Sequence, residues 1–81
     1  MKKEIMINTT QGLHAKLAAK IVQLANRYQG NVKLIYEDQV VDAKSILSLI
    51  SLAIPSGEYV TLVVEGDDAE DMIKDIEKIL G

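Results

Sequence analysis

The sequence predicts a two-layer α+β fold in which three amphipathic helices cover one side of a sheet of four short strands. Two observations support this class. Apolar residues recur with a period of two in some segments and at helical spacing in others, in the order βαββαβα. They make up 48% of the 81 residues, without Trp or Phe, so the core is expected to be aliphatic. No linker or repeat interrupts the chain, which predicts one domain over residues 1–81.

The first half of the chain is predicted to form a strand, a helix and a hairpin. In "KEIMIN", Ile5 and Ile7 share one parity, as in a strand with one buried face. Apolar residues then recur at steps of three and four residues, which predicts a helix over 15–28 that ends before Gly30. These apolar residues are Leu17, Ala18, Ile21, Val22, Leu24, Ala25 and Tyr28. Alternation in "NVKLIYE" and "DQVVD" predicts a hairpin from Val32 to Asp42.

The second half is predicted to form a short helix, a strand and a final helix. Ser45 opens the segment "SILSLISLA", and "PSG" closes it. The segment "EYVTLVVE" alternates as a strand with Val60, Leu62 and Val64 inward. The acidic run "EGDDAEDM" lacks the residue spacing of a calcium-binding loop. It is interpreted as the start of a helix, because acidic residues at the first turn and lysines later in the helix both interact favourably with the helix macrodipole. The buried face of this last helix is expected to be Ala69, Ile73, Ile76 and Leu80.

Charge and composition argue against several functional classes. A net charge of −3 speaks against nucleic-acid binding, which requires a basic surface. The longest nearly apolar run, Ile46 to Ile54, is too short for a membrane span, and "MKKEIMIN" develops no signal-peptide core. One histidine without cysteine cannot supply a usual zinc set. We therefore expect a cytoplasmic monomer with no metal and no cofactor.

The single histidine, His14, lies between a predicted turn at Gly12 and the first turn of the predicted helix. The first N–H groups of a helix have no partner within it and bind anions well. The backbone N–H groups of Ala15 and Leu17, with the ammonium of Lys16, are thus placed to support a phosphate on His14. The same positive helix end disfavours the imidazolium, so a neutral, nucleophilic ring is expected. The alternative interpretation is an exposed polar residue or a cap.

Ser45 is the second candidate residue. Its hydroxyl suits a helix N-cap, and capping alone is one interpretation. The helix after it is apolar nearly all round, and a helix this short cannot bury all of those side chains. We expect part of it to form an exposed apolar surface, of the kind that usually binds a partner. A phosphate on Ser45 would change the charge of that surface sharply.

Together these segments resemble the histidine-containing phosphocarrier HPr family of the phosphoenolpyruvate-dependent sugar phosphotransferase system. The resemblance covers the whole chain and is carried by "GLHAKLAA", by "DAKSILSLISLAIPSG", by the spacing between His14 and Ser45, and by the element order. It implies an open-faced β-sandwich with a four-stranded antiparallel sheet and three helices on one face. It also implies a carrier that is not itself an enzyme, because the phosphoryl group is held stoichiometrically.

The resemblance further implies site roles and partners. His14 would take a phosphoryl group from enzyme I and pass it to enzyme IIA proteins. Ser45 matches a serine that a dedicated kinase/phosphorylase modifies in many Gram-positive relatives, which weakens phosphotransfer and creates a corepressor for a transcriptional regulator. The expected partner interface is Ile46, Leu47, Ile50, Ala19 and Gln23.

This chain departs from the family motif at two positions beside the histidine. Lys16 and Leu17 stand where the family has arginine and proline, and Ala53 stands where many relatives carry glycine. Lysine is a point charge and lacks the planar fork of arginine. Three functions therefore stay open: a sugar phosphocarrier, a regulatory protein acting through Ser45 and protein binding, and a carrier in a non-sugar phosphorelay.

Overall fold

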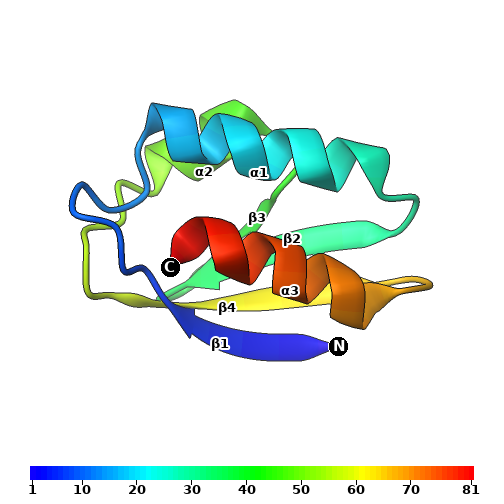
Figure 1. The fold of residues 1–81 in the computed structure, drawn as a ribbon. Helices are drawn as coiled ribbons and strands as arrows, with labels where there is room; N and C mark the ends of the chain where they lie inside the picture. Colours follow the sequence, from blue (N-terminus) through cyan, green and yellow to red (C-terminus); the bar gives the residue numbers. More distant parts are fainter.

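The computed structural model describes residues 1–81 and contains seven regular elements in the predicted βαββαβα order (Figure 1). The helices and strands are β1 (Lys2–Met6), α1 (Ala15–Arg27), β2 (Asn31–Tyr36), β3 (Gln39–Asp42), α2 (Ile46–Ser51), β4 (Tyr59–Glu65) and α3 (Ala69–Leu80). None of the three helices is long and apolar enough to cross a bilayer.

The four strands form one antiparallel sheet in the order β1-β4-β2-β3. Strand β4 therefore lies between β1 and β2, where Val60 pairs with Ile5 and Leu62 pairs with Leu34. This central place explains the clean alternation of β4, since every second side chain faces the helices and is buried. The buried residues of β1, β2 and β4 therefore lie on one face of the sheet, the face that the helices cover.

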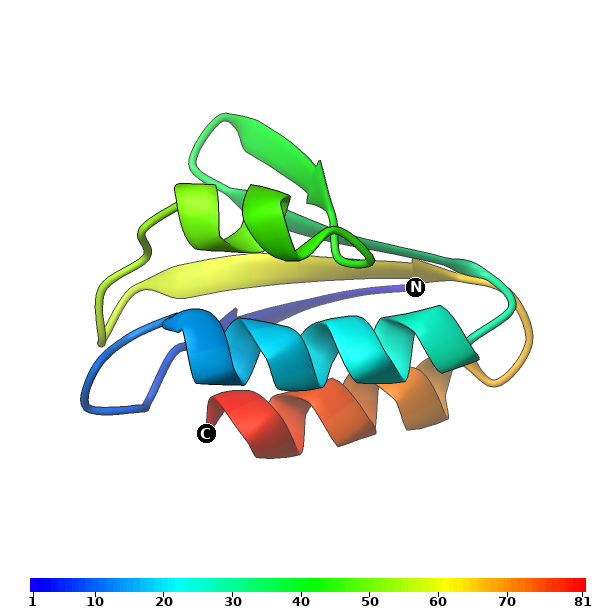
Figure 2. The same cartoon turned by 90° about the horizontal axis from the view of Figure 1, so that it is seen from above.

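All three helices cover the same face of the sheet, which confirms the open-faced α+β architecture (Figures 1 and 2). Seen from above, α1 and α3 lie side by side and run in opposite directions, while the short α2 lies over the other part of the sheet (Figure 2). Between the layers is one cluster of 20 buried apolar residues, and no polar or charged side chain is buried with it.

Helix boundaries differ slightly from the predicted ones, for backbone reasons. Helix α1 ends at Arg27 because Tyr28 is extended (φ −85°, ψ 136°). Helix α2 stops at Ser51, two residues before Ala53, whose φ of 50° lies in the left-handed region. Gly30 does not cap α1; a side chain there would overlap the carbonyl oxygen of Glu65. The glycine therefore permits a close approach between backbone segments.

Candidate functional site

The loop from Asn8 to His14 is held against the segment that follows α2, and both lie at the same end of the molecule (Figures 1 and 2). The Leu13 N–H donates to the carbonyl oxygen of Ile54 at 2.9 Å. Gly12 is buried with a φ of +71°, and a Cβ atom there would overlap that same carbonyl oxygen. Only glycine fits this backbone conformation and this contact.

The turn before His14 is closed by two further hydrogen bonds from one residue pair. The Gly12 N–H donates to the Thr9 carbonyl oxygen at 3.2 Å. The Thr9 hydroxyl donates to the Gly12 carbonyl oxygen at 2.7 Å. The sequence predicts a turn at Gly12 but does not single out Thr9. A threonine three residues before a glycine is a weak signal, because many such pairs make no contact.

His14 occupies the N-cap position of α1 with an extended backbone (φ −101°, ψ 174°). Its side chain is half-buried and makes no capping bond. The first N–H of the helix to find a partner is that of Ala18, which donates to the His14 carbonyl oxygen at 2.9 Å. The N–H groups of Ala15, Lys16 and Leu17 donate to nothing within the protein. The imidazole thus stands beside three unpaired backbone donors at a positive helix end.

The side chains after His14 divide between solvent and core. Ala15 and Lys16 are exposed, and the Lys16 ammonium forms no ion pair within the protein. Leu17 is buried, with 7% of its surface exposed, and belongs to the core cluster. The first turn of α1 contains no acidic residue. An anion at this helix end would therefore meet the N–H groups and Lys16 without a competing carboxylate in that turn.

Ser45 is the N-cap of α2, as predicted, and the residue is half-buried. The Ser48 N–H donates to Ser45 Oγ at a long 3.4 Å, and the Leu49 N–H donates to the Ser45 carbonyl oxygen at 3.2 Å. Next to it, Lys44 Nζ donates to the carbonyl oxygen of Tyr28, just beyond the end of α1, at 3.3 Å. Lys44 therefore ties the start of α2 to the end of α1.

Helix α2 exposes one side and buries the other, which confirms that its apolar residues cannot all be covered. Leu49 and Leu52 are buried, at 0% and 6% exposure. The α2 patch, defined as the exposed apolar residues of this helix, consists of Ile46 (38% exposed), Leu47 (78%) and Ile50 (39%). On α1, Gln23 is exposed and Ala19 is half-buried. Helices α1 and α2 are in contact with each other.

A family model described as "PTS HPr component phosphorylation site" matches residues 1–81. The chain belongs to the HPr family. HPr proteins are phosphocarriers of the phosphotransferase system, which places this chain in that class.

Individual relatives agree with this assignment and differ in their names. The phosphocarrier protein HPr of Haloferax volcanii is 39% identical over 82 residues, covering 99% of this chain and 92% of that protein. The HPr-like protein Crh of Halalkalibacterium halodurans is 38% identical over 74 residues, covering 91% of this chain and 88% of that protein. The crystal structure of HPr from Bacillus anthracis has a TM-score of 0.93 at 33% identity, covering 100% of this chain and 96% of that one.

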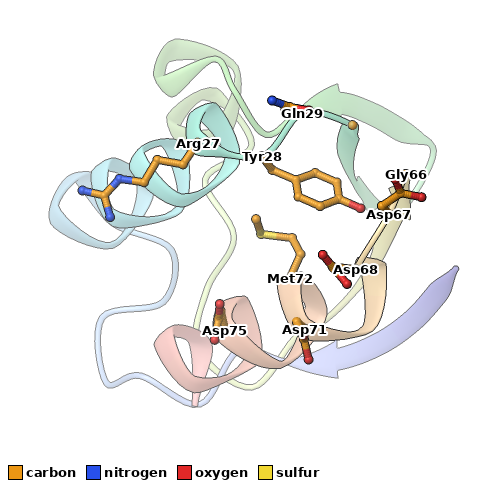
Figure 3. Close-up of a pocket in the computed structure, with 10 residues that line it drawn as sticks. Arg27, Tyr28, Gln29, Gly66, Asp67, Asp68, Asp71, Met72 and Asp75 are labelled. Atoms are coloured by element: carbon orange, nitrogen blue, oxygen red, sulfur yellow. The ribbon is translucent and has the colours of Figure 1, made fainter.

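The largest pocket of this HPr-family chain lies away from His14, at the far end of α1 (Figure 3). The two ends of a 13-residue helix are about 20 Å apart. The pocket has a volume of about 770 Å³ and is lined by Arg27, Tyr28, Gln29, Gly30, Gly66, Asp67, Asp68, Asp71, Met72 and Asp75. Asp67, Asp68 and Asp71 come from the acidic run at the start of α3, and Asp75 comes from the next turn of that helix. Nowhere in the protein do three possible ligand side chains gather for a metal ion.

Tyr28 is the unusual member of this pocket. Its hydroxyl is buried without a hydrogen-bond partner and lies close to Gly66 and Asp67 (Figure 3). Burial, and then the negative charges of Asp67 and Asp68, raise the pKa of Tyr28 above its ordinary value. A neutral phenol held in this way is not a nucleophile near neutral pH. The pocket therefore adds no group to phosphoryl transfer at His14.

Proposed function

We propose that this protein accepts a phosphoryl group from enzyme I on His14 and passes it to enzyme IIA-type acceptors. The main support is the pairing of a half-buried imidazole that makes no cap bond with three backbone N–H groups that have no partner. A phosphoryl group carries roughly −1.5 to −2 charges, by analogy with other phospho-residues. The positive end of α1 and the ammonium of Lys16 would stabilise that charge.

The chemistry requires one nucleophilic nitrogen and no further reactant. The lone pair of a His14 ring nitrogen attacks the phosphorus, a new N–P bond forms, and the bond between phosphorus and the donor atom of enzyme I breaks. The electron pair of the broken bond stays on that donor. Transfer to the acceptor runs the same way, with His14 as the leaving group. The N–H groups of Ala15, Lys16 and Leu17 are the nearest backbone donors in sequence for the transferring oxygens.

The test is labelling with enzyme I and radiolabelled phosphoenolpyruvate. We expect an acid-labile label on the protein and on Ser45→Ala, and none on His14→Ala. The serine variant is the control, because a label that disappears with it would be an acid-stable phosphoserine. An intact protein that stays unlabelled while a known HPr is labelled in the same reaction contradicts the proposal.

The α2 patch is the proposed docking surface for both partners. Leu47 is 78% exposed, so Leu47→Asp should leave the fold intact while it opposes apolar docking. We expect a KM for enzyme I raised at least about tenfold, the effect of roughly 1.4 kcal/mol of lost binding. Val40→Asp is the matched control, because Val40 is 59% exposed on β3 and faces away from the helices. Equal KM values for the two variants would exclude this surface.

A second candidate function is regulation through Ser45. It is favoured by the position of Ser45 at the start of α2 beside exposed Ile46 and Leu47, and by the long 3.4 Å capping bond that leaves its hydroxyl weakly held. Two relatives named HPr-like protein Crh also align over 91% of this chain. Here the partners would be a serine kinase/phosphorylase and a transcriptional regulator.

The two candidates are separated by which side chain is required. If the regulatory function holds, a serine kinase labels the wild type and not Ser45→Ala, and binding to the regulator survives in His14→Ala. Phosphotransfer from enzyme I that depends on His14, with no kinase labelling at Ser45, supports the carrier alone.

A further inference from the structure

The peptide bond between Gly12 and Leu13, directly before His14, is hydrogen-bonded at both of its ends. Its carbonyl oxygen accepts from the Thr9 hydroxyl at 2.7 Å. Its N–H donates to the Ile54 carbonyl oxygen at 2.9 Å. One partner comes from within the turn and the other from the segment after α2, so the plane of this peptide is held from two sides.

This peptide plane decides how the chain enters α1. Rotation about it combines the ψ of Gly12 with the φ of Leu13, and both residues are buried. The Leu13 side chain is 5% exposed in the core, so the two hydrogen bonds and this packing leave one orientation. His14 comes next, and its half-buried ring makes no capping bond that would hold it in place. The position of the ring therefore depends on the backbone that precedes it.

We propose that Thr9 is a positioning residue for His14: its hydroxyl holds the Gly12–Leu13 peptide so that the imidazole stands beside the free N–H groups of α1. This inference rests on the proposed phosphocarrier function. Thr9 does not touch the transferred group; it acts through the peptide plane. The backbone bond from the Gly12 N–H to the Thr9 carbonyl oxygen persists in any Thr9 variant, so loss of the hydroxyl removes one bond without deleting the turn.

The neighbouring residue supplies a matched control. Thr10 has the same side chain, is exposed, and makes no hydrogen bond within the protein. Thr9→Val and Thr10→Val each replace a hydroxyl by a methyl of similar shape. Thr9→Ser keeps the hydroxyl and removes only the methyl group. The set separates the hydrogen bond from general effects of changing the loop.

The first measurement is the steady-state rate of phosphorylation by enzyme I, with the protein as the varied substrate. We expect Thr9→Val to lower kcat by about three- to tenfold with KM unchanged, the range for one neutral hydrogen bond that ceases to contribute. Thr9→Ser should recover kcat to within about twofold of wild type, by the same bond. Thr10→Val should equal wild type. A wild-type kcat in Thr9→Val, or a serine variant as slow as the valine one, overturns the proposal.

A second measurement does not depend on phosphotransfer. Hydrogen exchange of the Leu13 amide should become faster in Thr9→Val and not in Thr10→Val, while the amide of Leu62 in the central strand keeps its protection. The ring-proton chemical shifts of His14 should move in Thr9→Val alone. If the wild type is never labelled by enzyme I, the carrier proposal fails, and these readings still decide the positioning role. Unchanged Leu13 exchange and His14 shifts in Thr9→Val exclude it.

Discussion

Lys16 is exposed in the first turn of α1 and has no ion-pair partner within the protein. A phosphoryl group on His14 would therefore meet an unengaged ammonium. Lysine offers a compact point charge, whereas arginine offers two parallel N–H donors that match phosphate oxygens. Lys16, one of the two residues that differ from the family motif beside His14, is thus the side-chain cation next to the proposed acceptor, and its identity should affect the rate of transfer.

We expect Lys16→Arg to speed transfer from phosphorylated enzyme I by about tenfold or more. One added charge-assisted hydrogen bond is worth about 1.5–3 kcal/mol, and that sets the factor if it is realised in the transition state. The measurement is a rapid-quench transfer rate. Lys20→Arg, an exposed lysine one turn further along α1, is the control and should change nothing. Equal transfer rates for the wild type and Lys16→Arg would show that the positive charge at this position matters and the hydrogen-bonding geometry of the side chain does not.

Helix α2 is six residues long and depends on what happens at its two ends. Ser45 caps its start with the side-chain oxygen, and Ala53 follows its end with a φ of 50°. A left-handed conformation costs a residue with a Cβ about 1–2 kcal/mol, which glycine avoids. The structure thereby accounts for the glycine that many relatives carry at this position, for which the sequence alone offered no reason. The strain lies next to Ile54, which also anchors Leu13.

Ala53→Gly should stabilise the protein by about 0.5–1 kcal/mol. Relief of left-handed strain contributes about 1–2 kcal/mol, and the greater freedom of glycine in the unfolded chain takes back about 0.4–1. Urea unfolding measures the difference. Gly57→Ala is the mirror-image control: its φ is +90° with no atom near a Cβ, so the substitution should destabilise through the backbone alone. A less stable Ala53→Gly would contradict this account of the α2 terminus.

The stability of the whole molecule depends mainly on one aliphatic core. Its 20 buried residues include no polar or charged side chain. The two salt bridges, Lys3–Glu77 and Lys74–Glu70, are exposed and contribute little. No disulfide supports the fold.

The dependence of stability on alkaline pH is expected to arise from two tyrosines. The pKa values of Tyr28 and Tyr36 are raised, first of all by burial and then by nearby carboxylates.

Stability should fall as the pH rises above 10, and Tyr28→Phe should reduce that fall. A tyrosine with a raised folded pKa keeps its proton after the unfolded chain has lost it near 10.0, so folding is penalised from there upward. At neutral pH, Tyr28→Phe should be no less stable than wild type, because the hydroxyl has no partner to lose.

Tyr36→Phe is the comparison for this effect, since its hydroxyl donates to Glu58 at 3.3 Å. It should lose some stability at neutral pH while also reducing the alkaline fall. Urea unfolding at neutral pH and above pH 10 distinguishes the two variants. If Tyr28→Phe is clearly less stable than the wild type at neutral pH, the Tyr28 hydroxyl of the wild type is hydrogen-bonded in solution, which contradicts this account.

Much of the fold could be predicted because short-range patterns of apolar residues specify it. The alternation of Val60, Leu62 and Val64 predicted a strand with one buried face, and the helical spacing of apolar residues in α1 predicted which side of that helix faces the core. Boundaries were predicted less well. Tyr28, Ala53 and Asp68 adopt backbone angles that depend on neighbouring segments, and residue type alone does not reveal them. The predicted face of α3 does not include Met72, which the structure buries in the core.

The sequence by itself determined the element order, the aliphatic core and the place of His14 and Ser45 at helix starts. These depend on residue periodicity and capping chemistry, which act over a few neighbouring positions. Only the tertiary structure decided the order of the strands and which side of α2 is exposed. It also decided that Thr9 and Ile54 hydrogen-bond to the peptide before His14. These contacts join segments that are far apart in the sequence, and a local residue pattern does not specify which distant backbone atoms come into contact.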